Sequence, residues 1–212
     1  MNDRELSPNA MYEVRTVAFI DILGFSDLVA RSTKDDRFLS NLYQALRIVE
    51  YQGRTWVALS LSSPGESKEE AQERIAAMDF RSHAFSDCLI LSQRGAMVGP
   101  LFISVAQLAM ALLNLGVLVR GGIAQGLLYH DASVVFGPAL IEAYYLESKC
   151  AKFPRILVSQ GVCDTAHKEI IHFPSEGSQA AYFLCELLRR DADRLYPLAF
   201  LRTTLLSPSS VI

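Results

Sequence analysis

The sequence predicts a mixed α+β fold, in which helices lie against a mainly antiparallel sheet. The run RTVAFIDIL, residues 15–23, is rich in β-branched and aromatic side chains, as buried strands are. Further along, strand-like and helix-like segments alternate, and two strand-like segments follow each other with only a polar stretch between them. Half of the residues are apolar and a fifth are charged, which is a globular composition with enough material for a core.

Local periodicity predicts the elements in order. Helical spacing runs from Phe25 to about Glu50, with a bend at STKDD (32–36). The expected later elements are a strand at 55–62, a polar loop at 62–74, a returning strand at 79–93, a helix at 100–114, two strands joined around 129–133, a helix at 138–152, a strand at 155–159 and a helix at 160–170. The order β-α-β-β-α-β, with these additions, is that of a ferredoxin-like sandwich. Its helices would lie on one face of the sheet and leave the other face free for a ligand or partner.

Length and charge bound the class of protein. The chain of 212 residues fits one large domain or, less comfortably, two small ones; we expect a single domain over 1–212 with a core at about 15–170. The net charge of −3 gives no electrostatic footprint for nucleic acid, so no nucleic-acid partner is expected. The four cysteines show no CxxC spacing and the N-terminus has no apolar leader, which favours a cytoplasmic protein with reduced thiols.

An uncharged run, 95–119, is long enough to span a membrane. Pro100, Ser104, Gln107 and Asn114 interrupt it, however, and a helix followed by a strand divides the run more naturally. We therefore expect no membrane partner.

Two aspartates stand beside apolar strand segments, in VAFIDILGFSDL (17–28) and HAFSDCLILS (83–92). The predicted topology places the first strand next to the hairpin strand, so Asp21 and Asp87 would project at the same edge of the sheet. Two carboxylates this close repel each other unless a cation lies between them. Without His or Cys ligands nearby, such oxygens suit Mg²⁺ or Mn²⁺ rather than zinc. Taken singly, Asp21 could instead cap the following helix and Asp87 could occupy a hairpin turn.

The residues after Asp21 suit an anionic ligand. Gly24 permits a tight turn and close approach of a ligand to the backbone. Phe25 and Ser26 begin a helix whose free N–H groups can receive phosphate oxygens. A metal pair next to an anion site is what nucleotidyl chemistry requires.

Four segments, in order, resemble motifs of the class III nucleotidyl cyclases. FIDILGFS and FSDCLILS are similar to the two metal motifs of that family, VRGGIAQGLLYH to the strand before its dimerisation hairpin, and VFGPALIEAYYLE to the Gly-led helix that carries its transition-state residues. The resemblance covers roughly residues 15–158. It implies a homodimer with active sites at the interface, and two divalent ions per site on Asp21, Asp87 and a backbone carbonyl near Ile22.

The sequence departs from that family at the positions that select a purine and stabilise the transition state. His83 stands where purine cyclases have a Lys, and Val134 where an Asp helps to select adenine. Ile141 and Tyr145 replace an Asn and an Arg on the helix. Two interpretations remain: a domain that has lost activity, or an intact enzyme with a different base pocket.

Metal motifs without purine determinants resemble the bacterial pyrimidine cyclases of antiphage (Pycsar) systems. That resemblance implies conversion of UTP, or alternatively CTP, into the 3′,5′-cyclic monophosphate and pyrophosphate, and a separate effector that the product activates. Arg120 is our first choice for the missing arginine and Lys149 the second, while Tyr145 is a candidate for the base pocket. Either cation could instead be an ordinary surface residue. An adenylate cyclase with an unusual pocket and a silent nucleotide-binding domain are the remaining alternatives.

Overall fold

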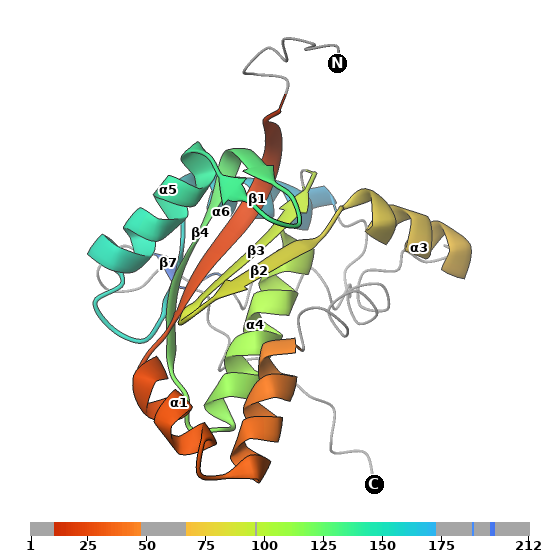
Figure 1. The fold of residues 1–212 in the computed structure, drawn as a ribbon. Helices are drawn as coiled ribbons and strands as arrows, with labels where there is room; N and C mark the ends of the chain where they lie inside the picture. The colour runs from red at the N-terminus through yellow and green to blue at the C-terminus, as the bar shows by residue number, and fades with distance from the viewer. Residues whose placement is uncertain (1–10, 48–66, 96, 173–187, 189–195, 198–212) are drawn as a thin grey trace, which may run out of the picture.

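A twisted sheet runs through the centre of the protein (Figure 1). The computed structural model describes residues 11–47, 67–95, 97–172, 188 and 196–197. Its strands are β1 (Glu13–Ile22), β2 (Arg81–Phe85), β3 (Cys88–Arg94), β4 (Val119–His130), β5 (Val135–Phe136), β6 (Ile156–Val158) and β7 (Tyr196–Pro197). They lie in the order β2-β3-β1-β4-β6-β7, and β5 pairs with β4.

The strand order confirms a mixed α+β fold with a mainly antiparallel sheet. β1 lies between β3 and β4 and is antiparallel to both, while β2 is antiparallel to β3. These four strands have the arrangement of a ferredoxin-like sandwich. β6 is parallel to β4, and β5 returns from β4 as the short hairpin expected around residues 129–133. Whether that hairpin contributes to dimerisation stays a prediction.

The helices confirm several predicted elements and refine others. They are α1 (Phe25–Ser32), α3 (Lys68–Ala77), α4 (Gly99–Leu113), α5 (Pro138–Tyr145), the π-helical turn η2 (Leu146–Cys150) and α6 (Gln160–His172). Residues 36–47 are also helical, and the bend predicted at 32–36 separates them from α1. Among the described helices, none combines the length and the apolar character that a membrane crossing needs.

The larger part of the core lies between the sheet and α4. Successive β1 residues alternate between the two faces, so Ala18, Ile20 and Ile22 all point toward α4. Leu101 and Leu108 of α4 are fully buried against that face. Most other residues of α4 are buried as well, which explains why this helix carries no charge. The run is therefore core and strand, as expected.

The opposite face of the sheet is not free, and here the expectation of helices on one face only is wrong. α5 lies across β1 and β4 (Figure 1). It buries Val17, Ala124 and Leu128 of the sheet against its own Ala139 and Ala143. The close contact is possible because β4 carries glycines where the helix crosses. A Cβ at Gly122 would meet the backbone oxygen of Ala143 and lie 2.7 Å from Cβ of Leu146.

The segment before β3 also differs from its prediction. The polar stretch expected as a loop at 62–74 contains the start of α3. Residues 79–93 form two strands instead of one, because a two-residue turn at Ser86–Asp87 joins β2 to β3. Ser86 takes a φ of 55°, a left-handed conformation that such tight hairpins use. The strand predicted at 55–62 lies outside the described residues.

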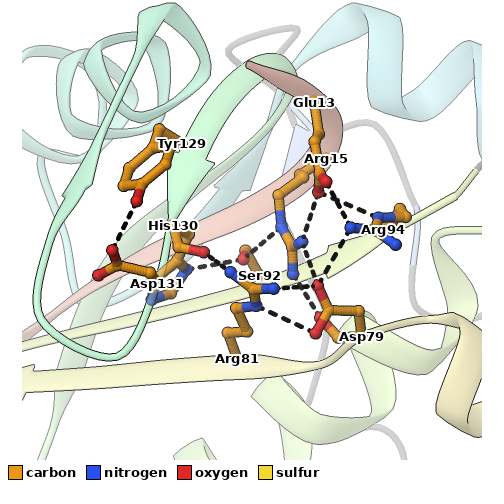
Figure 2. A network of polar contacts seen from close by, with 9 residues as sticks. All are labelled: Glu13, Arg15, Asp79, Arg81, Ser92, Arg94, Tyr129, His130 and Asp131. Atoms are coloured by element: carbon orange, nitrogen blue, oxygen red, sulfur yellow. Dashed lines mark hydrogen bonds and ion pairs between the residues drawn. The ribbon is translucent and has the colours of Figure 1, made fainter. Parts of the chain in front are cut away.

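A polar network lies at the far end of β1, on the same face as α5 (Figure 2). Arg15 is fully buried there, and its guanidinium donates to Asp79 Oδ2 at 2.9 Å and to Ser92 Oγ at 3.0 Å. Ser92 in turn contacts His130 Nδ1 at 2.8 Å, and Arg81 bonds the carbonyl of His130. A buried arginine needs such partners, so we assign this network a structural role.

Candidate functional site

Asp21 and Asp87 meet at one edge of the sheet, as the sequence predicts. Asp21 lies near the end of β1 and is paired in register with Cys88, the first residue of β3. The next residue, Ile22, donates its N–H to the carbonyl of Asp87 at 2.8 Å, which fixes the hairpin turn against the strand end. Carboxylate oxygens of Asp21 and Asp87 and the Cys88 sulfur all lie within 4.8 Å of one another. Asp87 therefore occupies a hairpin turn and also faces Asp21.

The charges at this edge explain the properties of Asp21. Partial burial raises the pKa of its carboxyl group, and the nearby Asp87 raises it as well. Arg120 lowers this pKa, but its effect is smaller than that of burial, so the pKa of Asp21 lies above its usual value. Ionised Asp21 is therefore disfavoured by the protein alone, and a bound cation would relieve that cost. The donor atoms are suitable, since carboxylate oxygens bind Mg²⁺ and Mn²⁺.

Cys88 corrects the expectation that no cysteine lies near the aspartates. Burial, followed by the charge of Asp87, raises the pKa of its thiol to about 11. The thiol is thus protonated at neutral pH, and only the thiolate is a good metal ligand. Two oxygen ligands beside a neutral thiol still fit a hard divalent ion.

The start of α1 lies directly after this strand end. Gly24 precedes the helix with φ 72° and ψ 26°, a left-handed conformation that favours glycine. No side chain caps the helix, so the N–H groups of Phe25 and Ser26 have no partner within it. The first turn can therefore receive an anion, although Asp27 in the same turn offsets part of its positive end. A ligand role for the Ile22 carbonyl stays a prediction.

Arg120 lies beside Asp21, as its position at the start of β4 indicates. The two residues are paired in register across β1 and β4, and Arg120 Nη2 is 3.4 Å from Asp21 Oδ2. The stronger partner of Arg120 is Glu147, whose Oε1 accepts from Nε and Nη2 at 2.5 Å each. Arg120 is thus ion-paired beside Asp21, and its role in the site stays a prediction.

Glu147 is a site residue that the sequence analysis missed. It is buried in the π-helical turn that follows α5. A signal for it exists: the buried residues of this helical segment recur every fourth position, at Ala139, Ala143, Glu147 and Ala151. A lone carboxylate on an alanine face that packs against a sheet indicates a buried partner.

The other predicted site residues lie away from the aspartate pair. Tyr145 and Lys149 are exposed on the outer side of α5 and η2, and within the described chain no contact links them to Asp21 or Asp87. Ile141 is also exposed on this helix. His83 lies on β2, where its ring centroid is 6.5 Å from that of His130, near the structural network.

Comparison with solved structures gives likenesses at low sequence identity. The adenylyl cyclase CyaB from P. aeruginosa is 16% identical with a TM-score of 0.47, over 74% of this chain and 82% of that chain. An adenylate/guanylate cyclase/hydrolase from Silicibacter pomeroyi is 13% identical with a TM-score of 0.47, over 88% and 94%. The monomeric guanylyl cyclase domain of the RhoGC fusion protein from the aquatic fungus Blastocladiella emersonii is 16% identical with a TM-score of 0.44, over 74% and 86%. Comparison of the sequence with protein-family models and with curated proteins gives no match.

Proposed function

We propose that the protein is a metal-dependent nucleotidyl cyclase that converts UTP into 3′,5′-cyclic UMP and pyrophosphate. One observation carries the proposal: the carboxylates of Asp21 and Asp87, from segments far apart in the sequence, converge next to an uncapped helix N-terminus. Such a site can bind divalent ions and phosphate oxygens together. The four motif segments that resemble class III cyclases support the same activity.

In the proposed reaction, the ribose 3′-oxygen attacks the α-phosphorus in line with the leaving pyrophosphate. Each residue of the site has a separate role in this step. Asp21 and Asp87 would hold two divalent ions, Mg²⁺ or Mn²⁺. Bound there, such ions lower the pKa of the attacking hydroxyl and neutralise charge on the phosphates. Phe25 and Ser26 offer backbone N–H groups to the triphosphate, and Gly24 lets it approach them. Arg120 supplies a guanidinium for the charge that gathers on the leaving pyrophosphate.

We propose a homodimer in which the outer side of α5 faces the partner's site. Ile141 is 70% exposed and Tyr145 is 57% exposed, which is unusual for large apolar or aromatic side chains on one short helix. In a dimer, Tyr145 would contact the base and Lys149 the phosphates of a nucleotide held by the other subunit. A larger side chain in that pocket suits a pyrimidine better than a purine.

The resemblance to pyrimidine cyclases of antiphage defence supports a role in signalling during phage infection. The cyclic nucleotide would be a second messenger in the cytoplasm, and a separately encoded effector would respond to it. Cyclic CMP is the alternative product. An adenylate cyclase with an unusual pocket, or a nucleotide-binding domain without turnover, are the remaining alternatives.

One incubation separates these functions. The purified protein is supplied with UTP, CTP, ATP and GTP in separate reactions with Mn²⁺, and the products are identified by mass spectrometry. Cyclic UMP is the expected product, whereas cyclic CMP or cyclic AMP would move the assignment to another base. If the folded protein forms no cyclic nucleotide from any of the four, the proposed activity is wrong. The Asp21→Asn variant, treated identically, controls for a contaminating cyclase.

A further inference from the structure

We propose that Glu147 is a positioning residue that holds the Arg120 guanidinium back from Asp21 and so keeps the Asp21 carboxylate available for a divalent ion. The inference rests on the proposed function, because it concerns the same metal site. It assigns a role to a residue that neither touches the substrate nor binds the metal.

The distances show an unequal competition between two acids for one guanidinium. Arg120 Nη2 lies 2.5 Å from Glu147 Oε1 but 3.4 Å from Asp21 Oδ2. Arg120 Nε also donates to the same Glu147 oxygen at 2.5 Å. Charge-assisted hydrogen bonds of this kind ordinarily measure about 2.7–2.9 Å. The guanidinium is therefore bound tightly to Glu147 and only loosely to Asp21.

Burial explains why Glu147 keeps the arginine. The Glu147 side chain is 4% exposed, against 33% for Arg120 and 20% for Asp21. A buried carboxylate without a partner costs several kcal/mol, whereas Asp21 retains contact with solvent. Glu147 lies on the buried face of its helical segment, in line with Ala139 and Ala143, which pack on β4. Losing the ion pair between Arg120 and Glu147 would thus cost more than losing the one between Arg120 and Asp21.

The local chain positions Glu147 for this contact. Ala139 and Ala143 occupy the same helical face, and Ala139 packs over Gly126 while Ala143 packs over Gly122. One turn further, Glu147 comes level with Arg120, two residues before Gly122 on β4. The π-helical turn that begins at Leu146 widens the helix there.

Removing the charge of Glu147 should therefore change Asp21. In Glu147→Gln the guanidinium retains Asp21 as its anionic neighbour and needs to move only from 3.4 Å to an ordinary ion-pair distance. A carboxylate in a tight pair with arginine is a poorer ligand, because the metal must displace the guanidinium first. The loss of metal affinity would thus pass through Arg120.

The test measures Mn²⁺ binding without nucleotide, from the electron paramagnetic resonance signal of free Mn²⁺. Glu147→Gln is expected to weaken Mn²⁺ binding by about 10- to 100-fold, the range found for residues that orient metal ligands. The double variant Arg120→Gln/Glu147→Gln, which leaves no buried charge unpaired, is expected to recover wild-type affinity or exceed it. Glu142→Gln, an exposed change on α5, is the matched control and should have no effect. Thermal unfolding checks that each variant is folded.

The outcomes separate this proposal from the proposed function. If Glu147→Gln binds Mn²⁺ as the wild type does, or if the double variant is as weak as Glu147→Gln, the positioning role is wrong while the metal site stands. If Asp21→Asn leaves Mn²⁺ binding unchanged, both the metal site and the role of Glu147 fall. If the predicted order of affinities holds but no cyclic nucleotide forms, the cyclase assignment fails and the role of Glu147 remains.

Discussion

Asp21 and Asp87 occupy positions that the fold alone does not explain. Asp87 suits its hairpin turn, yet that turn also directs it toward a second carboxylate. Asp21 receives no helix-capping role, because Gly24 precedes α1 and no side chain caps that helix. The raised pKa of Asp21 shows that its ionised form is held at a cost, with burial the largest cause. A half-buried carboxylate with a raised pKa that faces a second carboxylate is a candidate for a ligand-binding residue.

Asparagine at either position therefore tests function without harming the fold. Asp21→Asn and Asp87→Asn are each expected to lower turnover by at least about 100-fold, since each replaces a negatively charged carboxylate ligand with a neutral amide, which binds a divalent ion more weakly. The unfolding temperature of Asp21→Asn should equal that of the wild type or lie slightly above it, because the substitution removes a charge that burial disfavours. Asp27→Asn, an exposed change in the first turn of α1, is the control and should shift stability by no more than about 0.5 kcal/mol. Full activity in Asp21→Asn or in Asp87→Asn would contradict the assignment of these two residues as metal ligands.

His130 makes a second, independent prediction. Burial, followed by the positive charges of Arg15 and Arg81, lowers its pKa from 6.5 to about 4. Ser92 accepts a hydrogen bond from Arg15, and its own hydroxyl can donate to His130 Nδ1 when that nitrogen is unprotonated. The unfolded chain consequently binds more protons than the folded one between about pH 4 and 6.5, and stability rises with pH in that window.

The expected size of this effect is about 2 kcal/mol between pH 5 and pH 7. Denaturant unfolding at pH 5, 6 and 7 measures it in the wild type. His130→Gln should lose most of the difference, while His167→Gln, a change outside the network, should retain it. An unchanged pH dependence in His130→Gln would show that another group is responsible.

α5 shows why a helix can be predicted while its role is missed. Its length and spacing are visible in the sequence, but its buried face consists of alanines, which hydrophobic periodicity barely registers. The partner surface on β4 is equally inconspicuous, because Gly122 and Gly126 alternate there with Ala124. Only the combination of the two patterns indicates a helix in close contact with a strand. When the two patterns are considered separately, this face of the sheet is predicted to be uncovered.

The two glycines under α5 give a matched pair of substitutions. A Cβ at Gly122 would meet the backbone of Ala143, which cannot move aside, so Gly122→Ala should destabilise the protein by about 1–3 kcal/mol. At Gly126 the added Cβ would lie 3.6 Å from Cβ of Ala139, an ordinary contact, and Gly126→Ala should be nearly neutral. Chemical denaturation compares the two variants. Equal effects would mean that α5 does not pack on β4 as described.

Two polar regions lie on the same face of the sheet, at opposite ends of β1. Asp21, Asp87 and Arg120 lie at one end of β1. The network around Arg15 lies at the other end (Figure 2). Between them, α5 packs on Val17 of β1. The element order and the meeting of the two aspartates could be predicted, because strand alternation and the β-α-β-β-α-β order determine which strand ends are neighbours. The hairpin turn at Ser86–Asp87 is indicated only as an alternative role for Asp87, because the apolar residues on both sides of it favour a single strand over 79–93. Ion pairs such as Arg120 with Glu147 depend on side-chain packing that periodicity does not report.

The most direct test locates the metal itself. Crystals grown with Mn²⁺ and 3′-deoxy-UTP, which lacks the attacking hydroxyl group, are measured at the manganese absorption edge. The anomalous density is expected between Asp21 and Asp87, about 2.1 Å from a carboxylate oxygen of each, with the triphosphate at the start of α1. Nucleotide bound with manganese away from this pair, or with no manganese at all, would contradict the proposed site.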